Sequence, residues 1–127
     1  MKKKIITTLS APAPIGPYNR AVLMNNTLYL SGQIPLIPET MEIVDGDIKK
    51  ETQRVMQNLE AVLDAAEMNF ENVVKTSIFL SDMDNFGKVN EIYASDFNNE
   101  TAPARETIAV KTLPKSVRVE ISMIAAK

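Results

Sequence analysis

The sequence predicts one α+β domain over residues 1–127, with about six short strands in a single sheet and two helices packed on one face. Two observations predict this class. First, apolar residues make up 45% and charged residues 24% of the chain, as in globular proteins that can bury a core. Second, two segments carry apolar residues at helical spacing, whereas the others are short β-branched or alternating runs.

The N-terminal part predicts three strands and a stiff loop. Residues 5–9 are interpreted as a strand rather than a secretion signal, because their apolar stretch is too short for a signal. Three prolines in residues 11–17 favour extended backbone and exclude a helix. Residues 21–24 and 27–31 flank the Asn25-Asn26 pair, which tolerates positive φ, and therefore predict a β-hairpin.

A helix is predicted over residues 48–66, with Asp45 or Asp47 as its N-cap. Its apolar face consists of Ile48, Val55, Leu59, Val62, Leu63 and Ala66. Residues 72–80 follow it and are rich in β-branched side chains, which predicts a buried strand.

A second helix is predicted to begin at Ser81-Asp82. Its apolar face consists of Met83, Phe86, Val89, Tyr93 and Phe97. Two last strands, residues 105–110 and 117–126, flank a turn over residues 111–116 that contains a proline. The predicted order of elements is therefore ββ-β-α-β-α-ββ.

Alternation along the strands assigns side chains to the two faces of the sheet. In the last strand one face is apolar, and the other consists of Arg118, Glu120, Ser122 and Ile124. In the preceding strand, Ile108 and Val110 fit the helix-covered side. Arg105, Thr107 and Ala109 are therefore expected on the helix-free face. This mixed face either contacts another copy of the chain or is solvated, and the pattern favours neither.

The composition excludes several chemistries. The chain has neither Cys nor His, so it has no thiolate nucleophile, no Ser-His-Asp triad and none of the commonest transition-metal ligands. The net charge is −2 without a basic stripe, which argues against binding to nucleic acid or an anionic membrane. No apolar run approaches the length that spans a bilayer, and we expect a cytoplasmic protein.

Four short segments carry a resemblance that extends over nearly the whole chain. They are residues 13–18 (APIGPY), 31–35 (SGQIP), 73–80 (VVKTSIFL) and 103–105 (PAR). Residues 89–93 (VNEIY) and 113–115 (LPK) add to it. In this order, the segments resemble the RidA/YjgF family of reactive-intermediate deaminases.

The resemblance implies a chorismate-mutase-like fold and a homotrimer whose sheets form a central barrel, with ligand sites in clefts between adjacent subunits. It also implies hydrolysis of 2-imino acids, such as 2-iminobutanoate and 2-iminopropanoate, to 2-oxo acids and ammonia. These imines are tautomers of enamines released by PLP-dependent dehydratases. Because a protonated imine is already a strong electrophile, the reaction implies no metal and no cofactor.

Residue by residue, the resemblance makes Arg105 the clamp for the substrate carboxylate and Glu120 the group that positions or activates water. Gly32 would let the ligand approach the backbone, Ser31 would order a water, and Tyr18 would close the cleft. Each residue also has a structural alternative. The arginine can form a sheet-edge salt bridge, the glutamate can neutralise a nearby arginine, the serine can serve a turn, and the tyrosine can pack in the core.

Asn90 matches an asparagine near the family's interface, and its place on a helix flank favours a structural role. Thr107 stands where many members carry Cys. Glu106 stands where a small or hydroxyl residue is usual. Alternation places it on the face opposite Arg105, although a carboxylate close to that arginine would weaken anion binding. Lys75 is interpreted as a structural lysine rather than a Schiff-base former.

Two other functions compete with imine hydrolysis. The chain can be a regulatory protein of amino-acid metabolism that binds small carboxylic acids without turnover. It can also be an endoribonuclease, an activity found among some relatives, although its charge and its lack of His argue against this.

Overall fold

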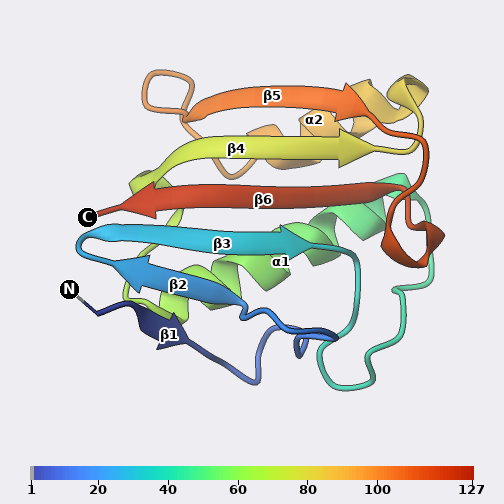
Figure 1. Cartoon of the computed structure of the whole chain (residues 1–127). Helices are drawn as coiled ribbons and strands as arrows, with labels where there is room; N and C mark the ends of the chain where they lie inside the picture. Colours follow the sequence, from blue (N-terminus) through green and yellow to red (C-terminus); the bar gives the residue numbers. More distant parts are fainter. Residues whose placement is uncertain (1) are drawn as a thin grey trace.

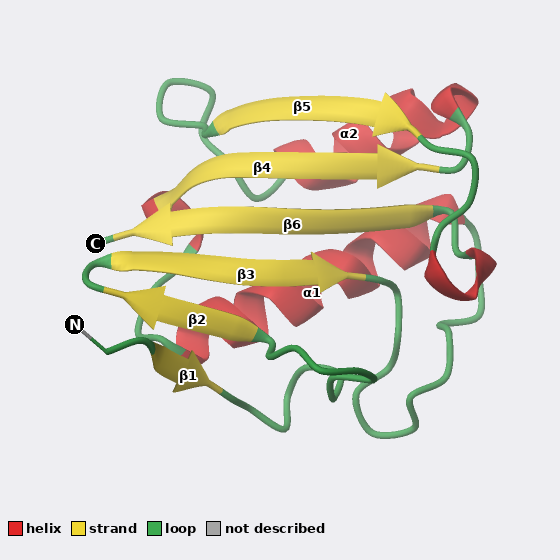
Figure 2. Cartoon of the chain, viewed as in Figure 1, coloured by secondary structure: helices red, strands yellow, loops and turns green. Residues whose placement is uncertain are grey.

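The computed structural model describes residues 2–127. It contains one mixed six-stranded sheet, in the order β1-β2-β3-β6-β4-β5, with two helices on one face (Figure 1, Figure 2). The strands are β1 (Lys4–Ile6), β2 (Ala21–Met24), β3 (Thr27–Gln33), β4 (Val73–Leu80), β5 (Ala104–Ala109) and β6 (Val119–Ala126). The helices are α1 (Ile48–Ala65) and α2 (Phe86–Ala94), and 3-10 turns lie at Phe70–Asn72, Met83–Asn85 and Pro114–Ser116. The predicted fold class is confirmed.

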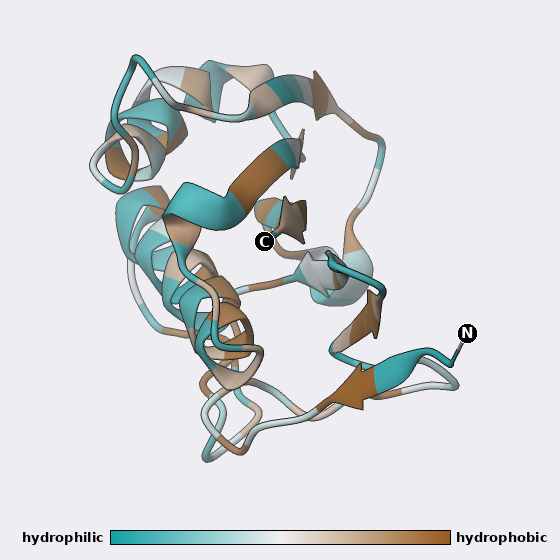
Figure 3. Ribbon diagram, turned by 90° about the vertical axis from the view of Figure 1, so that its left-hand side faces the viewer, coloured by the Kyte–Doolittle hydropathy of each residue, from teal (hydrophilic) through white to brown (hydrophobic). Residues whose placement is uncertain are grey.

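The main core lies between the helices and one face of the sheet. Alternate residues of β6, such as Val119 and Ile121, are fully buried, as the sequence pattern predicted. Leu59 and Val62 of α1 belong to the same buried cluster. Burying one such side chain contributes about 2 kcal/mol, so the alternation in β6 fixes which face receives the helices. Figure 3 shows the helices gathered on one side of the strands.

The structure refines several element boundaries. The first strand covers only Lys4–Ile6, which is shorter than predicted. The first helix begins where expected, and its N-cap is Asp47, whose carboxylate accepts a hydrogen bond from Lys50 N at 3.0 Å. The predicted start of the second helix, at Ser81-Asp82, is too early, because α2 begins at Phe86. The predicted first turn is a separate 3-10 turn, capped by Asp82, and Met83 in that turn is exposed.

The last two strands do not pair with each other. β6 pairs antiparallel with β3 and β4, whereas β5 pairs only with β4, in parallel, and forms an edge of the sheet. Figure 1 shows β4 between β5 and β6, so residues 111–116 form a connection past β4 rather than a hairpin turn.

The predicted orientation of β5 is wrong. Arg105 lies opposite Thr76, a fully buried residue of β4 whose side chain faces the helices. Arg105, Thr107 and Ala109 therefore occupy the helix-covered face, and Ile108 is 48% exposed on the helix-free face. The physical reason is that an edge strand is only partly covered by α2, so an amphipathic arginine can occupy its inner side. Alternating apolar residues in such a strand do not mark the core.

Candidate functional site

A hollow of about 370 Å³ lies where the ends of β3 and β6 meet the proline-rich loop. It is lined by Ile15, Tyr18, Ser31, Gly32, Ile34, Pro114 and Glu120. Four of these are predicted site residues, from three separate segments of the sequence. The sequence analysis missed the apolar walls that Ile15, Ile34 and Pro114 supply, although all three lie inside segments quoted for the resemblance.

Glu120 is the acidic group of this hollow. It lies on the helix-free face of β6, opposite Phe79 of β4, and its carboxyl is about half buried. Burial raises the pKa of Glu120 above its ordinary value. Within residues 2–127, the ion pairs join Lys49 to Glu91, Lys75 to Glu106 and Arg118 to Glu51. Within residues 2–127 of one chain, Glu120 therefore pairs with neither Arg118 nor Arg105.

Gly32 permits the position of this carboxyl. A Cβ added to Gly32 would lie 2.5 Å from Oε2, 3.0 Å from Cδ and 3.1 Å from Cγ of Glu120. These distances are shorter than normal van der Waals contacts, so any larger residue would displace the glutamate. The sequence analysis expected close approach of a ligand at Gly32, and the structure adds the side chain of Glu120 as a close neighbour.

Ser31 and Tyr18 hold the loop that walls the hollow. The Ser31 hydroxyl donates to the carbonyl of Asn19 at 2.6 Å, and the Ser31 amide donates to the carbonyl of Arg20 at 2.9 Å. Ser31 therefore has a structural role, but it joins the strand to the proline-rich loop rather than serving a local turn. Tyr18 is 47% exposed, so the core-packing alternative for it is wrong. Its hydroxyl oxygen accepts a hydrogen bond from Ile15 N at 3.4 Å, which directs the ring along the loop.

Arg105 and Asn90 form a second group, between β5 and α2. Arg105 Nη1 donates to Asn90 Oδ1 at 2.8 Å. The guanidinium carbon lies 5.0 Å from the ring centroid of Tyr93 and 5.7 Å from that of Phe86. Sequence reasoning assigned both rings to a core face and missed their contact with the arginine. No described carboxylate pairs with Arg105, so the salt-bridge alternative is wrong within residues 2–127.

A hollow of about 300 Å³ adjoins this second group. It is lined by Asn90, Tyr93, Ala94, Phe97, Asn99, Ala102, Pro103 and Arg105. Thr107 lies two residues further along the same face of β5, and its Oγ1 is buried without a hydrogen-bond partner in the described part of the chain. The group thus combines one cation with polar neighbours, which suits an anionic ligand.

Glu106 points away from Arg105, as alternation predicted. Its carboxylate accepts a hydrogen bond from the Ser77 hydroxyl and lies 3.0 Å from Lys75 Nζ. The Ser77 hydrogen bond, with help from Lys75, lowers the pKa of Glu106. Lys75 is therefore paired as a structural lysine, and the extra carboxylate lies on the far side of the sheet from the arginine.

One chain does not bring the two predicted catalytic residues together. Glu120 lies on the helix-free face of β6, whereas Arg105 lies on the helix-covered face of β5. Strand β4 separates these strands, which places their backbones about 10 Å apart even before the opposite directions of the side chains are considered. A site that uses both residues therefore needs a second copy of the chain.

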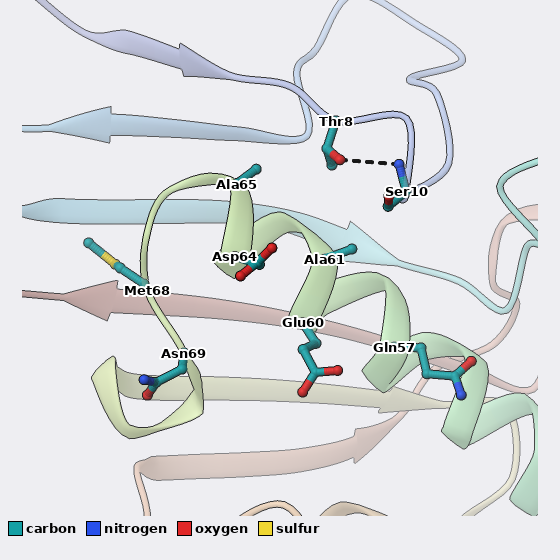
Figure 4. Close-up of a pocket in the computed structure, with 9 residues that line it drawn as sticks. All are labelled: Thr8, Ser10, Gln57, Glu60, Ala61, Asp64, Ala65, Met68 and Asn69. Carbon is teal, nitrogen blue, oxygen red and sulfur yellow. Dashed lines mark hydrogen bonds between the residues drawn. The ribbon is translucent and has the colours of Figure 1, made fainter.

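Another hollow, of about 390 Å³, contains none of the predicted site residues. Figure 4 shows Gln57, Glu60 and Asp64 of α1 facing it, with Thr8 and Ser10 on the loop after β1. No group of three acidic side chains in residues 2–127 could hold a metal ion. None of the described helices is both long and apolar enough to cross a membrane.

Comparison with known proteins identifies the family. Residues 8–127 match the family model described as "Endoribonuclease L-PSP", which represents RidA/YjgF proteins. The chain belongs to the RidA/YjgF family. The predicted resemblance is thereby confirmed over nearly the entire sequence.

Individual RidA relatives are similar along their full length. A 2-iminobutanoate/2-iminopropanoate deaminase of Mus musculus is 45% identical over 125 residues, covering 98% of this chain and 92% of the relative. The Rid family protein YyfA of Yersinia pestis has a TM-score of 0.95 at 44% identity, covering 99% of this chain and 100% of that one. TdcF of E. coli, solved with bound serine, has a TM-score of 0.91 at 36% identity, covering 98% of each chain.

Proposed function

We propose that this RidA-family protein is a single-domain enzyme that hydrolyses short 2-imino acids, such as 2-iminobutanoate and 2-iminopropanoate, to 2-oxo acids and ammonia. The observation that carries the proposal is the half-buried Glu120 carboxyl, which lies against apolar walls and, within residues 2–127 of one chain, has no neutralising cation. A carboxyl in such surroundings has a raised pKa, which suits it to accept and return a proton. The mouse relative bears the name of this activity.

We further propose that the working form is a homotrimer with a central barrel. Arg105 and Glu120 point to opposite faces of the sheet, so only neighbouring copies can combine them. The helix-free face also carries exposed apolar side chains, including Tyr29 and Ile108, which another copy would cover. In this assembly, Arg105 and Asn90 of one copy face Tyr18, Gly32 and Glu120 of the next.

The proposed reaction starts with the substrate carboxylate bound to the free N–H edge of Arg105. This fixes the protonated imine carbon near a water molecule, and proximity supplies much of the acceleration. The water oxygen bonds to that carbon while Glu120 takes one of the water protons. Glu120 then returns the proton to nitrogen. The C–N bond breaks as the new hydroxyl loses its proton to the departing ammonia, which leaves a 2-oxo acid and ammonium.

The remaining polar groups have supporting roles in this proposal. The lone pairs of the Ser31 oxygen can hold the water, because its proton is donated to Asn19. The buried Thr107 hydroxyl, which lacks a described partner, can bind a polar atom of the ligand. Imines of this kind hydrolyse in water, so the enzyme has to act where dehydratases release them, and we place it in the cytoplasm.

Ammonia release from 2-iminobutanoate, generated in situ by a PLP-dependent threonine dehydratase, tests the proposal. Arg105→Ala loses a charged hydrogen-bonding partner, and we expect kcat/KM to fall about 100-fold or more. Glu120→Gln should lower kcat by about 100-fold or more with little change in KM. Glu71→Gln, at an exposed glutamate, is the matched control and should behave as wild type.

The outcomes separate the competing functions. Wild-type turnover in Arg105→Ala would contradict the proposal. If the protein binds 2-oxobutanoate but releases no ammonia above the rate without protein, it is the non-catalytic carboxylate binder. Degradation of RNA that persists in Arg105→Ala would instead support the endoribonuclease named in the family description.

A further inference from the structure

The guanidinium of Arg105 rests on an aromatic ring that is itself held in place. The ring of Tyr93, from α2, lies 5.0 Å from the guanidinium carbon, which is within the range of a cation–π contact. Tyr93 is only 5% exposed, and its ring also packs against Phe97 with the centroids 4.6 Å apart. The ring therefore has a fixed environment on more than one side.

A hydrogen bond anchors the far end of this ring. The Tyr93 hydroxyl donates to Thr76 Oγ1 at 3.0 Å, and Thr76 is fully buried on β4. In the parallel register, Thr76 is the residue directly opposite Arg105. The strand position beside the arginine thus determines where the tyrosine ring lies, and the ring in turn supports the guanidinium.

Asn90 restrains the guanidinium of Arg105 in addition to the aromatic contact. Its Oδ1 accepts a hydrogen bond from Arg105 Nη1 at 2.8 Å, one turn before Tyr93 on the same helix. No other side-chain acceptor in residues 2–127 hydrogen-bonds to the guanidinium. The stacked and tethered group therefore keeps N–H donors free to meet a ligand carboxylate in one orientation.

We propose that Tyr93 is a positioning residue: its hydroxyl, held by Thr76, fixes the ring on which Arg105 stacks, so that the guanidinium is preorganised to bind the substrate carboxylate. The inference rests on the proposed function, in which Arg105 binds that carboxylate. An arginine side chain loses considerable conformational freedom when it binds a ligand, and a prearranged one loses less. Losing the anchor should therefore weaken carboxylate binding more than it slows chemistry.

Conservative substitutions test this role. Thr76→Val keeps the shape of the side chain and removes the acceptor, Tyr93→Phe keeps the ring and removes the donor, and Thr76→Ser keeps the acceptor. Losing one net hydrogen bond corresponds to about a fivefold effect. We expect KM for 2-iminobutanoate, and Kd for 2-oxobutanoate, to rise about fivefold in Thr76→Val and in Tyr93→Phe, with kcat changed less than about twofold. Thr76→Ser should retain wild-type KM.

A control and a double variant separate positioning from general destabilisation. Thr52 is also fully buried, but its hydroxyl bonds to the Ile48 carbonyl within α1, so Thr52→Val should change stability without changing KM. The double variant of Thr76→Val and Tyr93→Phe should be no worse than either single variant, because both remove the same hydrogen bond. Unchanged KM in both single variants, or equal KM effects in Thr76→Val and Thr76→Ser, would overturn the proposal.

A direct measurement keeps this inference separate from the proposed function. The Nε–Hε signal of Arg105 in an NMR spectrum reports the order of the guanidinium and the ring current from Tyr93. We expect Thr76→Val to shift and broaden this signal, and Thr76→Ser to preserve it. If the signal changes as expected but the wild-type protein neither binds 2-oxobutanoate nor releases ammonia, the proposed function fails while the positioning of Arg105 stands. An unchanged signal in Thr76→Val contradicts the positioning itself.

Discussion

Replacing Gly32 with alanine perturbs the position of Glu120 without removing a charged group. The added Cβ would lie 2.5 Å from Oε2 of Glu120, whereas an ordinary contact between such atoms is about 3.5 Å. The carboxyl must therefore move by about 1 Å. The backbone does not oppose the change, because Gly32 is not among the residues with positive φ.

The size of this displacement sets the expected loss of activity. A misplacement of about 1 Å in an active site can reduce the rate about 100-fold. We therefore expect kcat/KM for 2-iminobutanoate to fall about 100-fold in Gly32→Ala, mainly through kcat, because the carboxylate clamp Arg105 is untouched. The assay is ammonia release from imine generated by a threonine dehydratase, with thermal unfolding measured on the same samples.

Gly87→Ala is the matched control for this experiment. A Cβ on Gly87 meets nothing within 4 Å, and alanine is favoured in a helix by about 1 kcal/mol, so this variant should keep full activity and gain slight stability. In the Gly32→Ala background, Glu120→Gln should have little further effect, because the displaced carboxyl has already lost its role. Wild-type kcat/KM in Gly32→Ala would refute the position assigned to Glu120.

Four other predictions follow from the charged groups. The reaction needs the ionised form of Glu120, and burial raises the pKa of this carboxyl. We therefore expect kcat/KM to fall as pH falls through a pKa above that of an ordinary glutamate. Glu120→Gln should lose this acidic limb of the pH–rate profile. A carboxyl whose pKa is raised in the folded state stabilises the fold at low pH, and this stabilisation is lost as pH rises through the folded-state pKa. At pH 7 the ionised Glu120 therefore destabilises the fold, so Glu120→Gln should raise Tm relative to wild type. The increase in Tm should be smaller at pH 4. Arg118→Met leaves the buried Glu51 carboxylate without its ion-pair partner and should lower the free energy of unfolding by about 2 kcal/mol in urea titrations. Adding Glu51→Leu removes the buried charge and should restore the free energy of unfolding. Glu106→Ser should leave KM for the imine within about twofold of wild type, because Glu106 faces away from the arginine; a large fall in KM would contradict this orientation.

Local pattern was sufficient for the class of fold and for most elements. Alternation in residues 119–126 and helical spacing in residues 48–65 both report burial within one element, and burial dominates their energetics. The N-cap could be narrowed to Asp45 or Asp47 because the capping rule depends on neighbouring residues only. Motif order also sufficed to identify the family, which the comparisons confirm.

The sequence pattern did not predict features that depend on pairing between strands far apart in the chain. The orientation of β5 depends on its parallel register with β4 and on how far α2 extends over the edge, and neither is encoded in the alternation of five or six residues. The contact between Tyr93 and Arg105 was missed for the same reason, because it forms where α2 covers the edge strand β5. A ring that packs in the core can also support a cation at its margin.

Composition, local periodicity and short motifs can be read from the linear chain, and they were enough to predict an α+β fold, membership of the RidA/YjgF family and the polar candidates for its chemistry. The folded arrangement was needed to show that Glu120 lies beside Gly32 without an ion-pair partner in residues 2–127, that Arg105 is stacked on Tyr93, and that the two charged groups occupy opposite faces of one sheet. The reason is physical: desolvation, stacking and strand register arise from contacts between residues far apart in the chain, and they exist only once the chain has folded.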